Sequence, residues 1–432
     1  MDFENTGDPT FPVCGVDSNG NIAGLFGVFN DHVFTQDERD KIQTKIKADY
    51  DAFKFSFMQQ DPSSITSEFT TISFTDNDAP LSCLESSNVR IVQGGGISVL
   101  FGEADGIDFG NRDKKNEAFA DVSVWEFLSQ FLDGRFFESF SNIDVAGDFG
   151  VDLNAAKSFA IVRQAANTCA HELGHTLGLR HQNSFGAPGD GIPSTGAISP
   201  FDFVPVFDGP SNADETILHT MASGASVGLP FDGGVNMDRF FSERSAARLA
   251  INQKIDQVTE SEEALLDGVL NLKRLYVPNT IVEGENADAF IKVSAKVVEG
   301  SISTFGEADS FIITARKGEF INAELVPGFA TGQTFEDGIV GKIQVFSINR
   351  DDTEELIGSN SRSFESPLGT EVFDIVAPQN GQYRIEVSVP NEFFFDFNGE
   401  INRIPLSALR NGALLTGNYS LLAFTCRKRL RG

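Results

Sequence analysis

Three of the five histidines in this 432-residue chain fall within eleven residues. The segment is His171-Glu172-Leu173-Gly174-His175-Thr176-Leu177-Gly178-Leu179-Arg180-His181. On a helix, His171 and His175 lie one turn apart on the same face, where both imidazoles reach one metal ion. Glu172 lies beside that face, where its carboxylate can accept a proton from water without occupying a ligand position. The spacing therefore predicts a zinc site with a carboxylate next to it.

Gly178 and His181 complete the predicted site. Gly178 is expected to end the helix and turn the chain, with a positive φ that glycine adopts at little cost. His181 then returns to the metal from outside the helix. Three neutral imidazoles leave zinc its double positive charge and one open position, where the pKa of a water falls toward ~7. Packing of these groups in a core without a metal would leave costly polar groups unpaired.

This segment resembles the extended zinc motif of the metzincin zinc endopeptidases, with matches at His171, Glu172, His175, Gly178 and His181. That group also has a methionine-containing turn downstream, for which Met221 is the candidate. The resemblance covers about residues 25–260. It implies an α+β catalytic domain with a twisted sheet, a long first helix, a zinc helix and a C-terminal helix. It also implies bound Zn²⁺, Glu172 as general base and acid, and a protein or peptide substrate.

Helices and strands must position these groups. Thr35 and Glu38 form a capping-box pattern at the start of a helix whose apolar face carries Ile42, Ile46, Tyr50 and Phe53. An Ala-rich helix is expected from about Asn154 to Leu177, and another over Ser242–Leu249, extended to about Gln257. Strands are expected at Phe53–Met58, Thr70–Phe74 and Val89–Val92, and a loop at residues 102–121.

The second half of the chain changes character at about Tyr276. From there it is rich in Val, Ile, Phe and Gly, with turn signals about every ten residues, which indicates an all-β sandwich. Asp309-Ser310-Phe311, Gly381-Gln382-Tyr383 and Gly417-Asn418-Tyr419 resemble bacterial pre-peptidase C-terminal domains, which are β-sandwiches of secreted peptidases. The expected domains are a lead-in at 1–24, a peptidase domain at 25–262, a linker at 263–275 and a β-sandwich at 276–432.

Charge limits the kinds of partner. The chain has 33 basic and 62 acidic residues, a formal net charge of −29, which argues against nucleic acid as a partner. No run approaches the ~18 apolar residues of a spanning helix, so membrane insertion is not expected. An acidic loop could bind Ca²⁺, which takes about six to eight oxygen ligands, or could simply be solvated. Its candidate ligands are Asp105, Asp108, Asn111, Asp113 and Asp121.

The four cysteines and two further histidines have weaker signals. Cys14, Cys83, Cys169 and Cys426 allow three complete disulfide pairings, among which the sequence does not choose. The segment around Cys14 is faintly similar to the cysteine switch of matrixins, but a disulfide or an inert thiol is the favoured interpretation. His32 is expected to be structural. His219 is expected to be a loop residue bonded to backbone, with a place near the metal site as the alternative.

These observations predict a secreted, bacterial-type zinc endopeptidase with an accessory β-sandwich, although the start of the chain lacks a secretory signal pattern. An intracellular metallopeptidase therefore stays open. So does an adhesin or ligand-binding protein in which the sandwich acts and the zinc site is residual. Glu172 speaks against the last alternative, because a purely structural metal site needs no base. The sequence says nothing about the oligomeric state.

Overall fold

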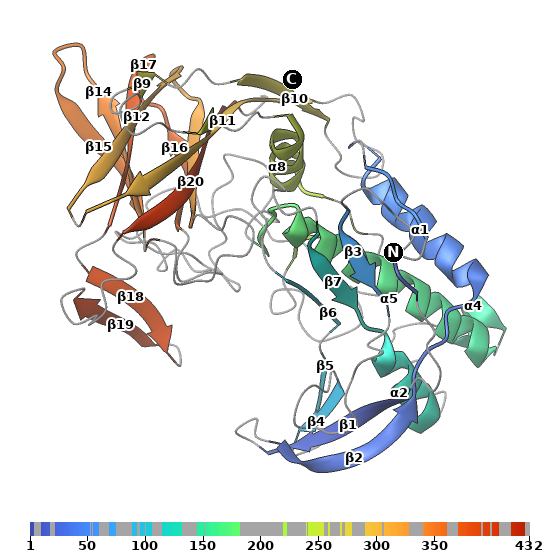
Figure 1. Cartoon of the computed structure of the whole chain (residues 1–432). Helices are drawn as coiled ribbons and strands as arrows, with labels where there is room; N and C mark the ends of the chain where they lie inside the picture. The colour runs from blue at the N-terminus through green and yellow to red at the C-terminus, as the bar shows by residue number, and fades with distance from the viewer. Residues whose placement is uncertain are drawn as a thin grey trace. The chain divides into compact units, whose positions relative to one another are not determined.

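The computed structural model of the chain folds into two compact units (Figure 1). The first comprises Met1–Leu179 with Ile217–Thr220 and Val227–Phe240, and the second comprises Arg180–Thr216, Met221–Ser226 and Phe241–Gly432. The structure describes residues 1–3, 10–17, 22–51, 53, 55–59, 69–74, 89–92, 96–99, 101–105, 115–131, 145–150, 152–181, 219–222, 239, 241–254, 258–259, 268–269, 273–278, 290–304, 306–327, 339, 341–360, 370–389, 392–397, 400–405 and 416–427.

The first unit contains two small sheets and four helices within its described residues. The helices are α1 (Gln36–Asp49), α2 (Ser123–Phe131), α4 (Val145–Phe149) and α5 (Leu153–Thr176). The first sheet has the strand order β2 (Ile22–Asn30), β1 (Thr10–Val16), β4 (Val89–Val92) and β5 (Gly96–Val99). The second has the order β3 (Thr71–Ser73), β7 (Glu117–Ala120) and β6 (Gly102–Ala104), and α5 packs against β6 and β7.

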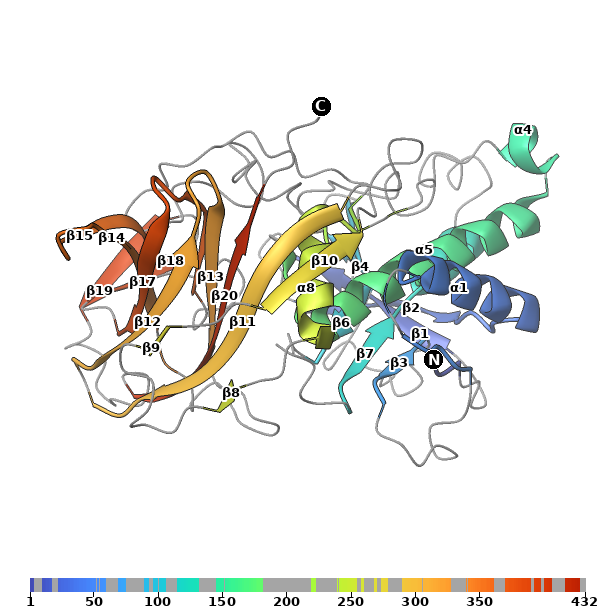
Figure 2. The ribbon, with the colours of Figure 1, turned by 90° about the horizontal axis from the view of Figure 1, so that it is seen from above.

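The two long helices of this unit follow the sequence closely. Thr35 caps α1, with the side chain of Glu38 reaching back to complete the predicted capping box. Ile42 and Ile46 are fully buried, as the apolar spacing predicted, and α1 lies beside α5 (Figures 1 and 2). The helix α5 begins after Asp152, whose side chain accepts hydrogen bonds from two backbone N–H groups of the first turn. Side-chain capping therefore accounts for where each of these two helices starts.

Three local expectations for this unit are wrong. Residues 10–16 are not a lead-in but form β1, which pairs with both β2 and β4 inside a sheet. Residues 55–59 form no strand. Instead, the ring of Phe55 packs edge-to-face against Tyr50, the ring of Phe57 packs against it at a tilt, and the carbonyl of Phe57 accepts a side-chain hydrogen bond from Gln43. The expected loop at 102–121 contains β6 and β7, which pair with each other.

The second unit is built mainly from a pair of facing sheets typical of a β-sandwich (Figures 1 and 2). One sheet has the order β10 (Lys273–Pro278), β11 (Phe290–Ile302), β20 (Gly417–Cys426), β13 (Phe320–Pro327) and β16 (Thr370–Val376), with β8 (Val258–Thr259) beside β11. The other has the order β15 (Glu354–Asn360), β14 (Lys342–Ile348), β17 (Gly381–Ser388), β12 (Ala308–Ala315) and β9 (Gly268–Val269). A separate hairpin joins β18 (Glu392–Phe397) to β19 (Glu400–Pro405).

Alternation along the strands explains the sandwich core. Phe311 and Ile313 of β12, Ile385 of β17, and Ile321 and Leu325 of β13 are all fully buried in one cluster. Intervening residues point to the opposite faces, as strand geometry requires. The expected β-rich second half is therefore confirmed. The segment expected to be a linker, 263–275, contains β9 and the start of β10. Helix α8 (Glu243–Lys254), which was expected in the peptidase domain, belongs to this unit.

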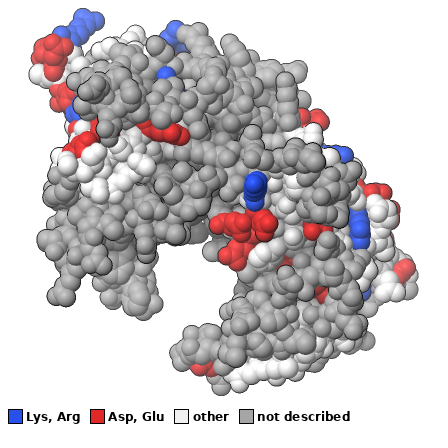
Figure 3. Space-filling view, in the orientation of Figure 1, with Lys and Arg blue, Asp and Glu red and all other residues white. Residues whose placement is uncertain are grey.

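The surface and the helices agree with the charge and hydropathy of the sequence. On the face in Figure 3, acidic side chains cover more of the described surface than basic ones do, in line with the net charge of −29. Among the described helices, none has a stretch long and apolar enough to cross a membrane.

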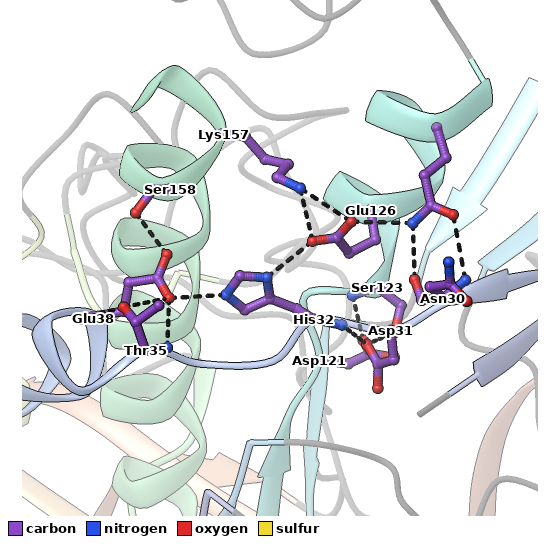
Figure 4. Close-up of polar contacts among 11 residues, drawn as sticks. Asn30, Asp31, His32, Thr35, Glu38, Asp121, Ser123, Glu126, Lys157 and Ser158 are labelled. Atoms are coloured by element: carbon purple, nitrogen blue, oxygen red, sulfur yellow. Dashed lines mark hydrogen bonds and ion pairs between the residues drawn. The ribbon is translucent and has the colours of Figure 1, made fainter. Parts of the chain in front are cut away.

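A buried polar cluster within the first unit holds α5 in place (Figure 4). His32 Nε2 lies 3.1 Å from Glu38 Oε2, and His32 Nδ1 lies 2.9 Å from Glu126 Oε1. On α5, Lys157 Nζ donates to both carboxylate oxygens of Glu126, and Ser158 Oγ donates to Glu38 Oε1. The cluster thus joins α1, α2 and α5 through one imidazole. This confirms the structural role expected for His32.

The cluster shifts the pKa values of His32 and Glu38 in opposite directions. Burial lowers the pKa of His32, but hydrogen bonds to Glu126 and Glu38 outweigh burial and raise that pKa above its ordinary value. Burial likewise raises the pKa of Glu38, but hydrogen bonds from His32, Ser158 and Thr35 outweigh it and lower that pKa to about 2. Protonated His32 therefore stabilises the fold below a pH of about 6.5, and this effect is lost as pH rises through the folded pKa. The contribution of Glu38 is present above about pH 4.5 and is lost as pH falls toward 2.

His32→Gln is therefore expected to destabilise the protein most between about pH 5 and pH 6, where both ionised partners are present. The difference in the free energy of unfolding between wild type and variant should shrink as pH rises above about 7. Urea denaturation across this pH range measures it. A difference that stays constant from pH 5 to pH 9 would contradict a charged imidazole in the cluster.

Candidate metal centre

The last turns of α5 bring the predicted ligands together. His175 Nε2 lies 3.1 Å from His171 Nε2, and the two rings are nearly perpendicular. One ligand atom from each of His171, His175 and His181 lies within 4.8 Å of the other two. Among the described residues, this is the one group of three or more His, Cys, Asp or Glu side chains that could hold a metal ion.

Backbone carbonyls set the orientation of the two helical imidazoles. His171 Nδ1 lies 2.7 Å from the carbonyl oxygen of Thr220, and His175 Nδ1 lies 2.9 Å from that of Leu179. Because a carbonyl oxygen can only accept, each Nδ1 carries the hydrogen, and in the neutral imidazole each Nε2 presents a lone pair. Two such lone pairs 3.1 Å apart repel one another unless a metal ion or a proton lies between them.

The donor set fits zinc. Metal-binding histidines usually donate their other ring N–H to a carbonyl or carboxylate, as both of these do. Two imidazole nitrogens at ~2.0–2.1 Å from a tetrahedral zinc would be about 3.3 Å apart, close to the 3.1 Å between His171 Nε2 and His175 Nε2. His171, His175 and His181 are therefore the residues that would hold the metal.

Gly178 ends α5 in the predicted way. Its φ is +83°, in the left-handed region that favours glycine. Its N–H donates to the carbonyl of His175, and the N–H of Leu179 donates to the carbonyl of Gly174. This pair of hydrogen bonds is the Schellman motif. The turn brings the Leu179 carbonyl to His175 Nδ1 and sends the chain on to His181.

Glu172 is buried, and its side chain packs closely against Gly102 of strand β6. A Cβ added at Gly102 of β6 would lie 2.9 Å from Glu172 Cγ, 2.5 Å from Thr168 Cγ2 and 2.7 Å from the carbonyl oxygen of Phe119. The last of these is backbone, which cannot rotate away. Gly102 therefore sets how closely β6 approaches the side chain of the predicted base.

Gly102→Ala is expected to destabilise the protein by about 1–3 kcal/mol, because the added methyl overpacks this contact. Displacement of Glu172 should also lower any peptidase activity by more than tenfold, with zinc content unchanged. Gly15→Ala is the matched control, since its added Cβ would meet nothing closer than 3.7 Å. Activity and unfolding midpoints equal to wild type in Gly102→Ala would contradict the packing argument.

The methionine candidate lies next to a residue that contacts the site. Met221 is fully buried, and the preceding residue, Thr220, supplies the carbonyl that orients His171. His219 is also buried. A sequence motif cannot reveal a backbone carbonyl acceptor, because any residue type supplies one. Neither Thr220 nor Leu179 was therefore predicted.

The other candidate groups have different outcomes. Cys14 is buried in β1 and is disulfide-bonded, so it cannot act as an inhibitory thiolate. Cys169 and Cys426 are free thiols whose pKa values burial raises well above the ordinary range, which makes them inert.

The calcium prediction is only partly covered by the structure. Asp105 accepts a hydrogen bond from the N–H of Glu117, and buried Asp121 accepts one from the N–H of Ser123. Both carboxylates therefore support the local backbone. Asp108, Asn111 and Asp113 lie outside the described residues. A calcium site in this loop stays a prediction.

The residues that resemble pre-peptidase C-terminal domains lie in the sandwich core. Phe311 and Tyr383 are fully buried, and Tyr419 is almost so. The hydroxyl of Tyr383 donates to the carbonyl of Gln379 at 2.6 Å, and that of Tyr419 donates to Asp309. These short patterns therefore mark core positions of the sandwich.

No protein-family model matches the chain, and no curated protein sequence matches it. Solved structures that match parts of it include two periplasmic inhibitors of g-type lysozyme. PliG from Salmonella Typhimurium is 13% identical over 37% of this chain and 96% of its own, with a TM-score of 0.18, and PliG from Aeromonas hydrophila is 14% identical over 37% and 99%, with a TM-score of 0.19. The pre-peptidase C-terminal domain of a Bacillus anthracis collagenase is 12% identical over 29% of this chain and 87% of its own, with a TM-score of 0.18. Likenesses this low assign no family.

Proposed function

We propose that this protein is a secreted zinc-dependent endopeptidase of the metzincin type. The observation that carries the proposal is the pair of imidazoles on α5, whose Nδ1 atoms donate to carbonyls while their Nε2 atoms lie 3.1 Å apart, with His181 in reach. A buried glutamate follows the first of these histidines directly. This combination matches the needs of peptide hydrolysis by an activated water.

Each residue has a definite part in the proposed reaction. His171, His175 and His181 hold the metal. When bound, zinc supplies Lewis-acid chemistry that lowers the pKa of a water and polarises the scissile carbonyl. The Glu172 carboxylate takes the proton of the attacking water and delivers it to the leaving nitrogen, so that an amine departs. Gly178 and the carbonyls of Thr220 and Leu179 keep the imidazoles in place.

Secretion is part of the proposal. A disulfide at Cys14 supports an oxidising compartment, because disulfides rarely persist in the cytosol. The pronounced net negative charge favours solubility in salty or calcium-rich surroundings.

The test is hydrolysis of casein, an unstructured protein, by the full chain. Zinc-loaded protein is expected to cleave it, a chelator is expected to stop cleavage, and added zinc should restore it. Absence of cleavage by zinc-loaded, processed protein would overturn the peptidase proposal and favour a binding protein that acts through its β-sandwich. Cleavage that a chelator leaves unchanged would overturn the metal mechanism.

A further inference from the structure

Two buried glutamates, Glu324 and Glu371, lie on the sheet face of the sandwich opposite its apolar core. Along β13, Ile321, Ala323 and Leu325 belong to the core, so Glu324 points to the other side, yet it is only 3% exposed. Glu324 lies directly opposite Glu371 of β16 in the strand register, and Glu371 is equally buried. Like charges directly opposite one another on adjacent strands are destabilising. This sheet face therefore requires cations.

Arginines supply those cations from outside the sheet. Arg180 Nη1 donates to Glu371 Oε1, and Arg180 Nε lies 3.3 Å from Glu324 Oε1. Arg248 of α8 donates through both terminal nitrogens to the two oxygens of Glu324, with Nη2 at 2.7 Å from Oε1. The side chain of each of these four residues is at most 4% exposed. The guanidinium of Arg180 thus spans both glutamates.

The position of Arg180 in the chain is the important point. It lies between Leu179, whose carbonyl orients His175, and His181, the third candidate ligand. His181 follows the helix-ending turn, so helical spacing does not set its position as it does for His171 and His175. The chain before it is held instead by the Leu179 carbonyl and by the buried Arg180 side chain.

Buried ion pairs are poorly suited to adding stability, because desolvation offsets much of their attraction. An arginine ion pair does restrict position, however, because the planar, forked guanidinium forms hydrogen bonds with carboxylates in only a few orientations. A hydrophobic contact of equal size would hold the chain less specifically. The two carboxylates therefore restrict the position of the Arg180 guanidinium.

We propose that Glu324 and Glu371 of the β-sandwich are positioning residues for the metal centre, acting through Arg180 on His181. The inference rests on the proposed zinc site, but it does not require that the protein be a peptidase.

Glu371→Gln in the full chain tests this, with Asp374→Asn as the matched control. Both changes remove one buried carboxylate charge from β16, but Asp374 pairs with Arg244 of α8, which adjoins no ligand. Zinc affinity is measured by competition with a chromophoric chelator, ligand geometry by the visible spectrum of the Co²⁺-substituted protein, and stability by thermal unfolding of the apoprotein.

Glu371→Gln is expected to weaken zinc binding by about 10–100-fold and to alter the Co²⁺ spectrum. Asp374→Asn should leave zinc affinity within about twofold of wild type. This should hold even if Asp374→Asn lowers the unfolding temperature as much as Glu371→Gln does. Arg180→Lys provides a second variant, since it keeps the positive charge near both glutamates but removes the planar guanidinium that contacts both of them. It too should weaken zinc binding and alter the spectrum.

Wild-type zinc affinity and Co²⁺ spectrum in both Glu371→Gln and Arg180→Lys would overturn the proposal, as would equal losses of zinc affinity in Glu371→Gln and Asp374→Asn. If wild type binds no zinc, the positioning role falls together with the metal site. If wild type binds zinc with the expected dependence on Glu371 but does not cleave casein, the positioning role stands and the peptidase proposal fails.

Discussion

Glu172→Gln is expected to lower kcat/KM for a peptide substrate by about 10²–10⁴-fold, the usual contribution of a general acid–base group. The amide has nearly the same shape as the carboxylate, so packing against Gly102 should be preserved. It cannot accept the proton of the attacking water. A fluorogenic peptide assay with the zinc-loaded protein measures the loss.

Zinc content decides how that result is interpreted. Because Glu172 is not one of the three grouped ligands, the variant should bind zinc as wild type does. Glu103→Gln is the matched control, since it makes the same chemical change on the exposed neighbour of Gly102 and should leave activity unchanged. Equal cleavage by wild type and Glu172→Gln would refute the proposed mechanism.

Arg244→Met is expected to give the largest loss of stability, about 3–5 kcal/mol, because it removes one partner of a buried ion pair. Arg244 Nη2 lies 2.9 Å from Asp374 Oδ2, and both side chains are almost fully buried. The guanidinium also lies over the ring of Phe373. The variant would leave the carboxylate of Asp374 buried without this arginine. Urea denaturation at pH 7 measures the change in the free energy of unfolding.

The double variant Arg244→Met with Asp374→Asn provides the control. Removing both charges avoids the uncompensated buried carboxylate, so the double variant should recover most of the stability lost in the single one. A cost below about 1 kcal/mol for Arg244→Met alone would show that the pair behaves like a surface ion pair.

The boundaries of α1 and α5 were predictable because they depend on local contacts. The capping box at Thr35 and Glu38 satisfies N–H groups within one turn. The positive φ of Gly178 follows from the need to end a helix shortly before His181. The spacing of the three histidines also correctly predicted that their side chains lie close together.

The predictions that were wrong concern segments whose structure depends on a partner that their own residue pattern does not show. The aromatic residues after Phe53 alternate as a strand would, but they pack on Tyr50 instead of pairing with a strand. Residues 10–16 look like an irregular lead-in because nothing nearby in the sequence shows their pairing with Val89–Val92. Short strands such as β6 and β7 carry too few residues for a periodic signal.

By itself the sequence determined which three histidines could hold a metal ion, where helix α5 begins and ends, and that the second half is β-rich. These follow from residue type and from spacing over a few turns. The tertiary structure alone decided which carbonyls orient His171 and His175, how closely Gly102 approaches Glu172, and which arginines neutralise Glu324 and Glu371. The physical reason is that such partners are chosen by packing between segments more than forty residues apart, or by backbone atoms that every residue type possesses.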